Sequence, residues 1–313
     1  MSKLLDNLCR IWIYLTNDFI KHNGIDCSFK ADESWVILSP IEQEIKRKIE
    51  KVGTHLKDWS IKINYGIKTG CNGKPEIDEG IFIISDKQRK ELITQDPKSA
   101  EIIRPILRGR DIKKYGYNFA DLWLINAHNG IKEKGIKPID INDYPAIKRR
   151  LDKYYSELEK RQDKGDTTYN LRNCAYMDDF SRPKIVWIEL VDRPNFALDE
   201  TGIMINNTVF FITGNNIHFL LAYLNSTLCD WHFGKICATS GAGTRRWIKQ
   251  YIEQIYAPIP NEKQNQDMKI LIEKIDKASE NLKMKLISEI DDKIFSLFNL
   301  SIEEKNFIKN SIP

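Results

Sequence analysis

Apolar side chains recur at helical spacing in the first fifty residues. One such pattern covers residues 2–22, and a second begins at Ser39 and Pro40, with Glu42 three positions after Ser39. A Ser followed by Glu three residues later is the signature of a capping box, and Pro suits the first helical turn. The sequence therefore predicts helices over 2–22 and 39–52.

Helical spacing returns in the second half of the chain. Residues 144–162 form a polar helical pattern, and the leucines of 217–233 share one face. After Pro260, isoleucines and leucines predict one long amphipathic helix that ends near Asn299, and Ser301 can cap a last short helix.

The central part of the chain has the pattern of strands and turns. Apolar and polar residues alternate from Ile61 to Tyr65, and the runs 121–126, 185–190 and 203–212 are rich in branched and aromatic residues. A further helix is expected over 85–94. The fold class is therefore predicted as α+β: a strand-rich centre flanked by N-terminal helices and a long C-terminal helix. The expected division is 1–58, 59–260 and 261–313.

Composition narrows the class of protein. Of 313 residues, 42% are hydrophobic and 29% charged, and 48 Lys and Arg against 44 Asp and Glu give a net charge of +4, which excludes a disordered chain. Asp6, Arg10 and Asp18 interrupt the apolar N-terminal stretch, so neither a membrane span nor a signal peptide is expected. The six Cys form no CxxC pair. These features predict a cytoplasmic protein with reduced thiols and no membrane partner.

Motifs of catalysis are absent from the sequence. There is no GxGxxG between a strand and a helix, no GxxxxGK[ST], no HExxH and no GxSxG, and the five His do not cluster with Cys. Cys174 has no His nearby in the sequence that could activate it. We therefore predict no catalytic residue and no metal ligand.

Four segments instead combine glycine turns, cations and amide or aromatic side chains, and they are, in chain order, residues 64–72, 103–115, 169–176 and 239–247. Such segments can approach phosphates closely and read base edges. The ordinary alternatives are a polar hairpin for the first, a surface with Arg108 paired to Asp111 for the second, loop packing for the third and a surface loop for the fourth. As candidate DNA contacts we select Lys68, Thr69 and Asn72, then Arg108, Arg110, Lys113 and Lys114, then Arg172 and Asn173, and lastly Thr244, Arg245 and Arg246.

At these segments the sequence resembles the TaqI-like C-terminal specificity domain, the target-recognition part of adenine-N6 methyltransferases and type IIG restriction–modification enzymes. The matching stretches lie within residues 34–260 and include INYGIKTGCN (63–72), SAEIIRPILRGRDIKKYGY (99–117) and GAGTRRWIKQYIEQIYAPIP (241–260). The resemblance implies a DNA-binding domain that sets sequence specificity. Because no methyltransferase motif fits within 1–34, the methyltransferase and nuclease domains of complete members are expected outside this chain.

This resemblance implies double-stranded DNA and a methyltransferase or nuclease domain or subunit as partners. It implies no cofactor in this chain, with S-adenosylmethionine and Mg²⁺ expected only for the catalytic domains. Whether the chain is itself an enzyme stays open. The alternatives are an intact methyltransferase or nuclease with unrecognised motifs, or a scaffold for protein assembly.

Overall fold

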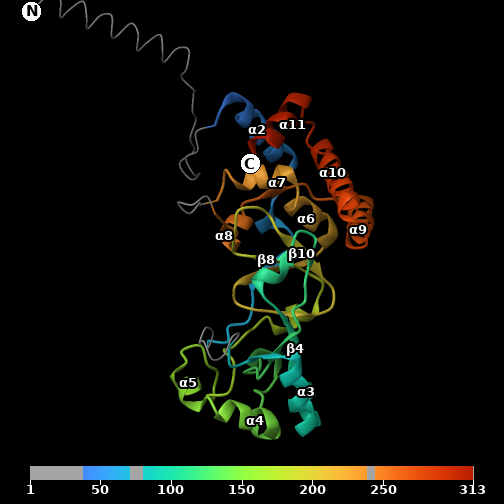
Figure 1. The fold of residues 1–313 in the computed structure, drawn as a ribbon. Helices are drawn as coiled ribbons and strands as arrows, with labels where there is room; N and C mark the ends of the chain where they lie inside the picture. The colour runs from blue at the N-terminus through green and yellow to red at the C-terminus, as the bar shows by residue number, and fades with distance from the viewer. Residues whose placement is uncertain (1–37, 71–79, 238–243, 313) are drawn as a thin grey trace, which may run out of the picture.

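The computed structural model describes residues 38–70, 80–237 and 244–312, and Figure 1 shows their arrangement. The helix predicted over 2–22 and the candidate contact Asn72 lie outside the described residues. Most helices gather at one end of the molecule, and α3, α4 and α5 lie at the other.

A four-stranded antiparallel sheet connects the two ends. Its strands occur in the order β10 (Phe196–Asp199), β8 (Lys184–Ile188), β12 (Val209–Gly214) and β2 (Ile61–Tyr65). Consecutive residues along a strand of this sheet belong to different hydrophobic cores, because successive side chains of a strand point to opposite faces. On β8, Ile185 and Trp187 enter the first core and Val186 enters the second. Burial on both faces explains the unbroken apolar run from Ile185 to Ile188 in this strand.

The first core belongs mainly to helices. Its members pack around the outer face of the central sheet, where α6 contacts α9, α10 contacts α9, and α11 contacts α7. These helices are α2 (Pro40–Val52), α6 (Ile217–Leu224), α7 (Thr227–Phe233), α8 (Lys249–Ile252), α9 (Glu262–Asp276), α10 (Glu280–Ser296) and α11 (Ile302–Ser311).

The second core lies between the other face of the central sheet and a second sheet. The strand order there is β11 (Met204–Ile205), β4 (Ile103–Leu107), β7 (Leu122–Ile125) and β3 (Ile83–Ser85), with β11 parallel to β4 and the other pairs antiparallel. The helix α3 contacts β3, β7 and α4. The helices of this part are α3 (Asp86–Gln95), α4 (Pro145–Asp152) and α5 (Tyr155–Lys160).

Three short two-stranded ladders complete the described sheet structure. They are β1 (Thr54–His55) with β14 (Tyr256–Ala257), β5 (Ile112–Lys113) with β6 (Gly116–Tyr117), and β9 (Leu190–Val191) with β13 (Arg245–Arg246).

The α+β class and most predicted elements are confirmed. The structure contains α2 with its Ser39–Glu42 capping box, α3, α11, and strands within each predicted run. The division of the chain at 58 and 260 stays a prediction, while the two cores group the elements differently: α2 and α9–α11 share one core with strands of the central part.

Three predicted single helices are wrong, because each is two helices. The pattern over 144–162 becomes α4 and α5, 217–233 becomes α6 and α7, and the long C-terminal helix becomes α9 and α10. In the second case Ser226 has extended backbone and its side chain accepts a hydrogen bond from the Cys229 amide, so it starts a new helix. Ser279, also extended, is the N-cap of α10.

Candidate nucleic-acid interface

The first and third candidate segments meet at one buried arginine. Arg161 is 4% exposed, and its Nη1 donates to the Thr69 carbonyl at 2.8 Å while its Nη2 donates to the Asn170 carbonyl at 2.6 Å. The guanidinium also lies over the Phe82 ring, 4.6 Å from its centroid. Gly70 (φ +68°) passes so close that a Cβ there would lie 2.7 Å from Arg161. Arg161 therefore fixes the turn after β2 against the loop that carries Arg172 and Asn173.

The polar side chains of these two segments differ in access to solvent. Arg172 and Asn173 are exposed, and Arg172 pairs with Asp163 at 2.8 Å. Lys68 is half-buried, with its ammonium 5.7 Å from the centroid of the Tyr65 ring. Thr69 is buried, so its hydroxyl is not presented to a large ligand in this conformation.

The second segment contains both an internal pair and exposed cations. Arg108 bonds to Asp111 through Nε and Nη2, each at 2.9 Å. This is the pairing expected if the second segment is an ordinary charged surface. Arg110 and Lys113 are exposed beside this pair. The bidentate Arg108–Asp111 pair closes the short turn that presents these two cations.

Lys114 is directed toward the helical part of the molecule. Burial lowers its pKa, against the attraction of Asp291 on α10 and Asp230 on α7. Arg245 bonds to Asp230 as well, at its carboxylate and, at 2.9 Å, at its carbonyl oxygen. Arg245 thus holds the fourth segment to α7, while Lys114 is attracted by carboxylates of both α10 and α7.

The fourth segment lies beside the second at the end of β8. Arg246 is exposed and bonds to Glu189 at 2.6 Å, and the Glu189 carbonyl accepts from the Trp247 amide. Thr244 is half-buried, and Trp247 is buried and stacks on Phe233 with centroids 3.6 Å apart.

Gly109 brings the second segment to the same end of β8. A Cβ on Gly109 would lie 2.7 Å from Ile188 and 3.2 Å from the Thr208 hydroxyl, and the Glu189 amide donates to the Thr208 carbonyl at 3.4 Å. The structure therefore joins the first segment to the third and the second to the fourth. Which of these side chains touch DNA stays a prediction.

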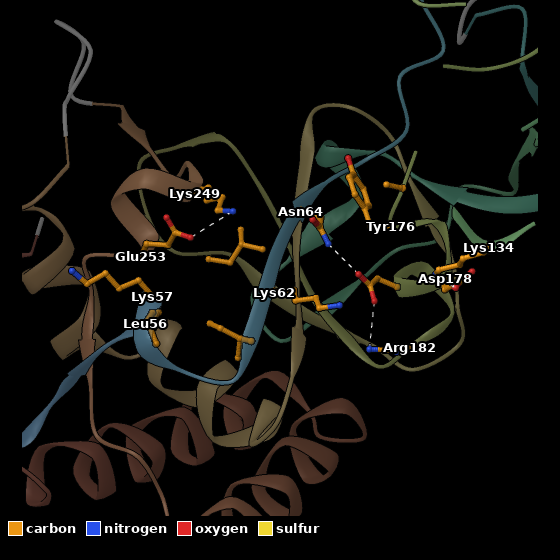
Figure 2. Close-up of a pocket in the computed structure, with 14 residues that line it drawn as sticks. Leu56, Lys57, Lys62, Asn64, Lys134, Tyr176, Asp178, Arg182, Lys249 and Glu253 are labelled. Atoms are coloured by element: carbon orange, nitrogen blue, oxygen red, sulfur yellow. Dashed lines mark hydrogen bonds and ion pairs between the residues drawn. The ribbon is translucent and has the colours of Figure 1, made fainter. Parts of the chain in front are cut away.

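A cavity of about 470 Å³ contains cations that the sequence motifs did not select. It borders β2, the start of α8 and the segment 175–182 (Figure 2). Lys62 is an exposed residue in an alternating strand, a pattern too common to mark a binding site without the fold. The basic residues of the cavity wall are Lys57, Lys62, Lys134, Arg182 and Lys249.

Over residues 38–70, 80–237 and 244–312, no group of three or more His, Cys, Asp or Glu residues is able to hold a metal ion. No helix in that part is long and apolar enough to cross a membrane.

Burial raises the pKa of Cys174 to about 11, so its thiol stays protonated at neutral pH.

Comparison with known proteins identifies the central part of the chain. Residues 104–259 match the model of the TaqI-like C-terminal specificity domain. The match contains the third and fourth candidate segments and all but the first residue of the second. No curated protein sequence matched the chain.

Among solved structures, the chain is similar to the type IIL restriction–modification enzyme MmeI, which was solved in complex with DNA. The similarity has a TM-score of 0.59 at 15% identity and covers 81% of this chain and 35% of MmeI. The type IIG restriction endonuclease BpuSI gives a TM-score of 0.48 at 14% identity, over 82% of this chain and 32% of BpuSI. The chain thus spans about a third of the length of each enzyme. Residues 104–259 belong to the TaqI-like C-terminal specificity domain family.

Proposed function

We propose that this chain recognises a DNA target sequence for a restriction–modification system. The observation that carries the proposal is the specificity-domain match over residues 104–259, which contains nine of the twelve candidate contacts: Arg108, Arg110, Lys113, Lys114, Arg172, Asn173, Thr244, Arg245 and Arg246. Residues outside this match pack into the same first core, so the whole chain would act as the recognition part.

The exposed cations supply the chemistry that duplex DNA requires. Lysine ammonium groups neutralise phosphates, while an arginine fork can bond to both acceptors of a guanine edge. Arg110, Lys113, Arg172 and Arg246 are all exposed, and they come from three of the four segments. Arg245 has its internal partner, Asp230, on α7 and would act mainly by fixing the fourth segment, and Lys114 is half-buried.

Catalysis would come from a separate domain or subunit. We propose an adenine-specific methyltransferase, with or without a nuclease, and S-adenosylmethionine and Mg²⁺ would bind there. The cytoplasm would be the place of action, since Cys174 and Cys229 are buried free thiols, as is usual in a reducing compartment. If calorimetry shows that this chain alone binds S-adenosylmethionine, the proposal that catalysis resides in a separate domain or subunit is wrong.

The charge of Lys113 provides a test of DNA binding. In titrations of a labelled duplex at several salt concentrations, Lys113→Ala should reduce the slope of log K against log [salt] by about one unit, because one phosphate contact is lost. Arg110→Ala should weaken binding by about 1–3 kcal/mol, as the loss of a guanidinium that reads a base does.

Lys277→Ala is the matched control, because Lys277 is an exposed lysine between α9 and α10, outside the specificity-domain match. This variant should bind as the wild type does. If Lys113→Ala and Arg110→Ala both leave affinity and slope unchanged, the assignment of the second segment is wrong.

A further inference from the structure

The cavity beside β2 is built from parts of the chain that are distant in sequence. Lys62 and Asn64 come from β2, Lys249 from α8, and Tyr176 and Arg182 from the segment that precedes β8. Because β2 continues directly toward Lys68, the cavity lies next to the first candidate segment.

Positive charge exceeds negative charge in the cavity wall. Five cations face three carboxylates, an excess of two, and three of the cations have a carboxylate partner within the wall. These pairs are Lys134 with Asp178, Arg182 with Asp179 at 3.5 Å, and Lys249 with Glu253 at 3.6 Å.

Lys62 is a cation of this wall without such a partner. Its ammonium makes no side-chain hydrogen bond or ion pair with any residue that the structure describes. Figure 2 shows Lys62 on the same side of β2 as the Asn64 amide and the Arg182 guanidinium, whereas Lys57 extends away from them. Arg182 is itself open to solvent, with 60% of its side chain exposed.

We propose that Lys62, with Arg182 and Asn64, binds a phosphate of the DNA backbone. The inference rests on the proposed function and adds a contact outside the specificity-domain match. An ammonium and a guanidinium are donors that phosphate oxygens accept. Asn64 Nδ2 donates one N–H to Asp179 at 3.3 Å, and its second N–H is the one that would reach the phosphate. Such a contact carries no sequence information, so Lys62 would place the duplex relative to the candidate segments that read bases.

An unpaired lysine on β2 has a second physical explanation. The strand β2 is at the edge of the central sheet, and exposed lysines on edge strands prevent pairing with other chains. This explanation predicts no change in DNA binding when the charge is removed, so the two explanations are separable by experiment.

The test uses Lys62→Gln in the full chain, with Lys277→Gln as the matched control. Lys62→Gln should lower the salt slope of duplex binding by about one unit and weaken binding to all sequences by the same factor. Because Lys62 is exposed, the Tm of Lys62→Gln should equal that of the wild type. Wild-type binding with an unchanged slope in Lys62→Gln overturns the phosphate contact alone. If the wild type binds no duplex at all, the proposed function fails, and the phosphate contact with it.

A free phosphate compound is the other source of the same chemistry. The shift of Tm by inorganic phosphate distinguishes the two sources. The DNA contact predicts the same shift in the wild type and in Lys62→Gln. A stabilisation that only the wild type shows, together with an unchanged DNA slope, would make the cavity a site for a free phosphate compound and overturn the inference.

Discussion

Arg161 shows how one buried side chain can organise an exposed surface. Its guanidinium bonds to main-chain carbonyls of Thr69, Thr168 and Asn170, and none of these acceptors depends on the side chain of its residue. The identity of the neighbouring side chains is thus free to vary while the backbone of the two segments stays in place. A recognition domain benefits from this arrangement, because specificity resides in side chains and their placement resides in the backbone.

The buried His232 makes the stability of the fold depend on pH. Burial lowers its pKa from 6.5 to about 4, and the nearby Lys46 and His55 act in the same direction. The unfolded chain therefore binds a proton between these pH values that the folded chain does not bind. Stability is fully present above pH 6.5 and falls as the pH drops toward 4.

We predict that His232 contributes about 3 kcal/mol to this acid loss, since one pKa unit corresponds to about 1.4 kcal/mol. The free energy of unfolding, measured by urea denaturation at pH 7 and pH 4, should fall less in His232→Phe than in the wild type. An equal fall in both proteins would show that His232 does not titrate in this way. The comparison cancels the carboxylates that titrate in both chains.

At the scale of elements, the crossing of β2 and the segment before β12 depends on Gly66. A Cβ on Gly66 would overlap the main-chain carbonyls of Ile205 and Asn206, and these backbone atoms cannot rotate away as a side chain can. The Ile67–Asn206 bridge and the Gly66 amide bond to Val209 hold the crossing together.

Gly66→Ala should therefore lower the free energy of unfolding by about 3 kcal/mol or more, as strong overpacking does. Gly116→Ala is the matched control, because a Cβ there meets nothing within 4 Å. Thermal unfolding of the two variants tests the difference. Equal Tm values would mean that β2 can move away from the 205–206 segment.

Much of the fold could be predicted because its signals are local. Ser39 with Glu42 and Ser301 with Glu304 form capping boxes that the sequence displays within a few residues. The breaks at Ser226 and Ser279 were missed because the apolar faces continue across them, and a serine can stand inside a helix as well as at its N-cap.

The candidate site was less accessible to prediction. The four segments were visible as cations and glycines, but their joining by Arg161 and by the end of β8 comes from tertiary contacts. Lys62 and Arg182 were missed for the same reason: each is an ordinary exposed cation until the fold brings β2 and the segment before β8 together.

On the scale of the whole molecule, the central sheet is the connection between the two cores. Its residues alternate between them, so the helical part and the strand-rich part cannot move apart without exposing apolar surface of the sheet. Duplex DNA bound to segments of both parts would meet one rigid frame. The chain spans about a third of the length of MmeI.

Selection from a pool of random duplexes measures the central claim most directly. The purified chain should enrich one short motif over successive rounds, and a duplex with that motif should bind at least about 10³-fold more tightly than a scrambled one at the same salt concentration. Binding without enrichment, with equal affinity for motif and scrambled duplexes, would contradict the claim that this chain recognises a target sequence.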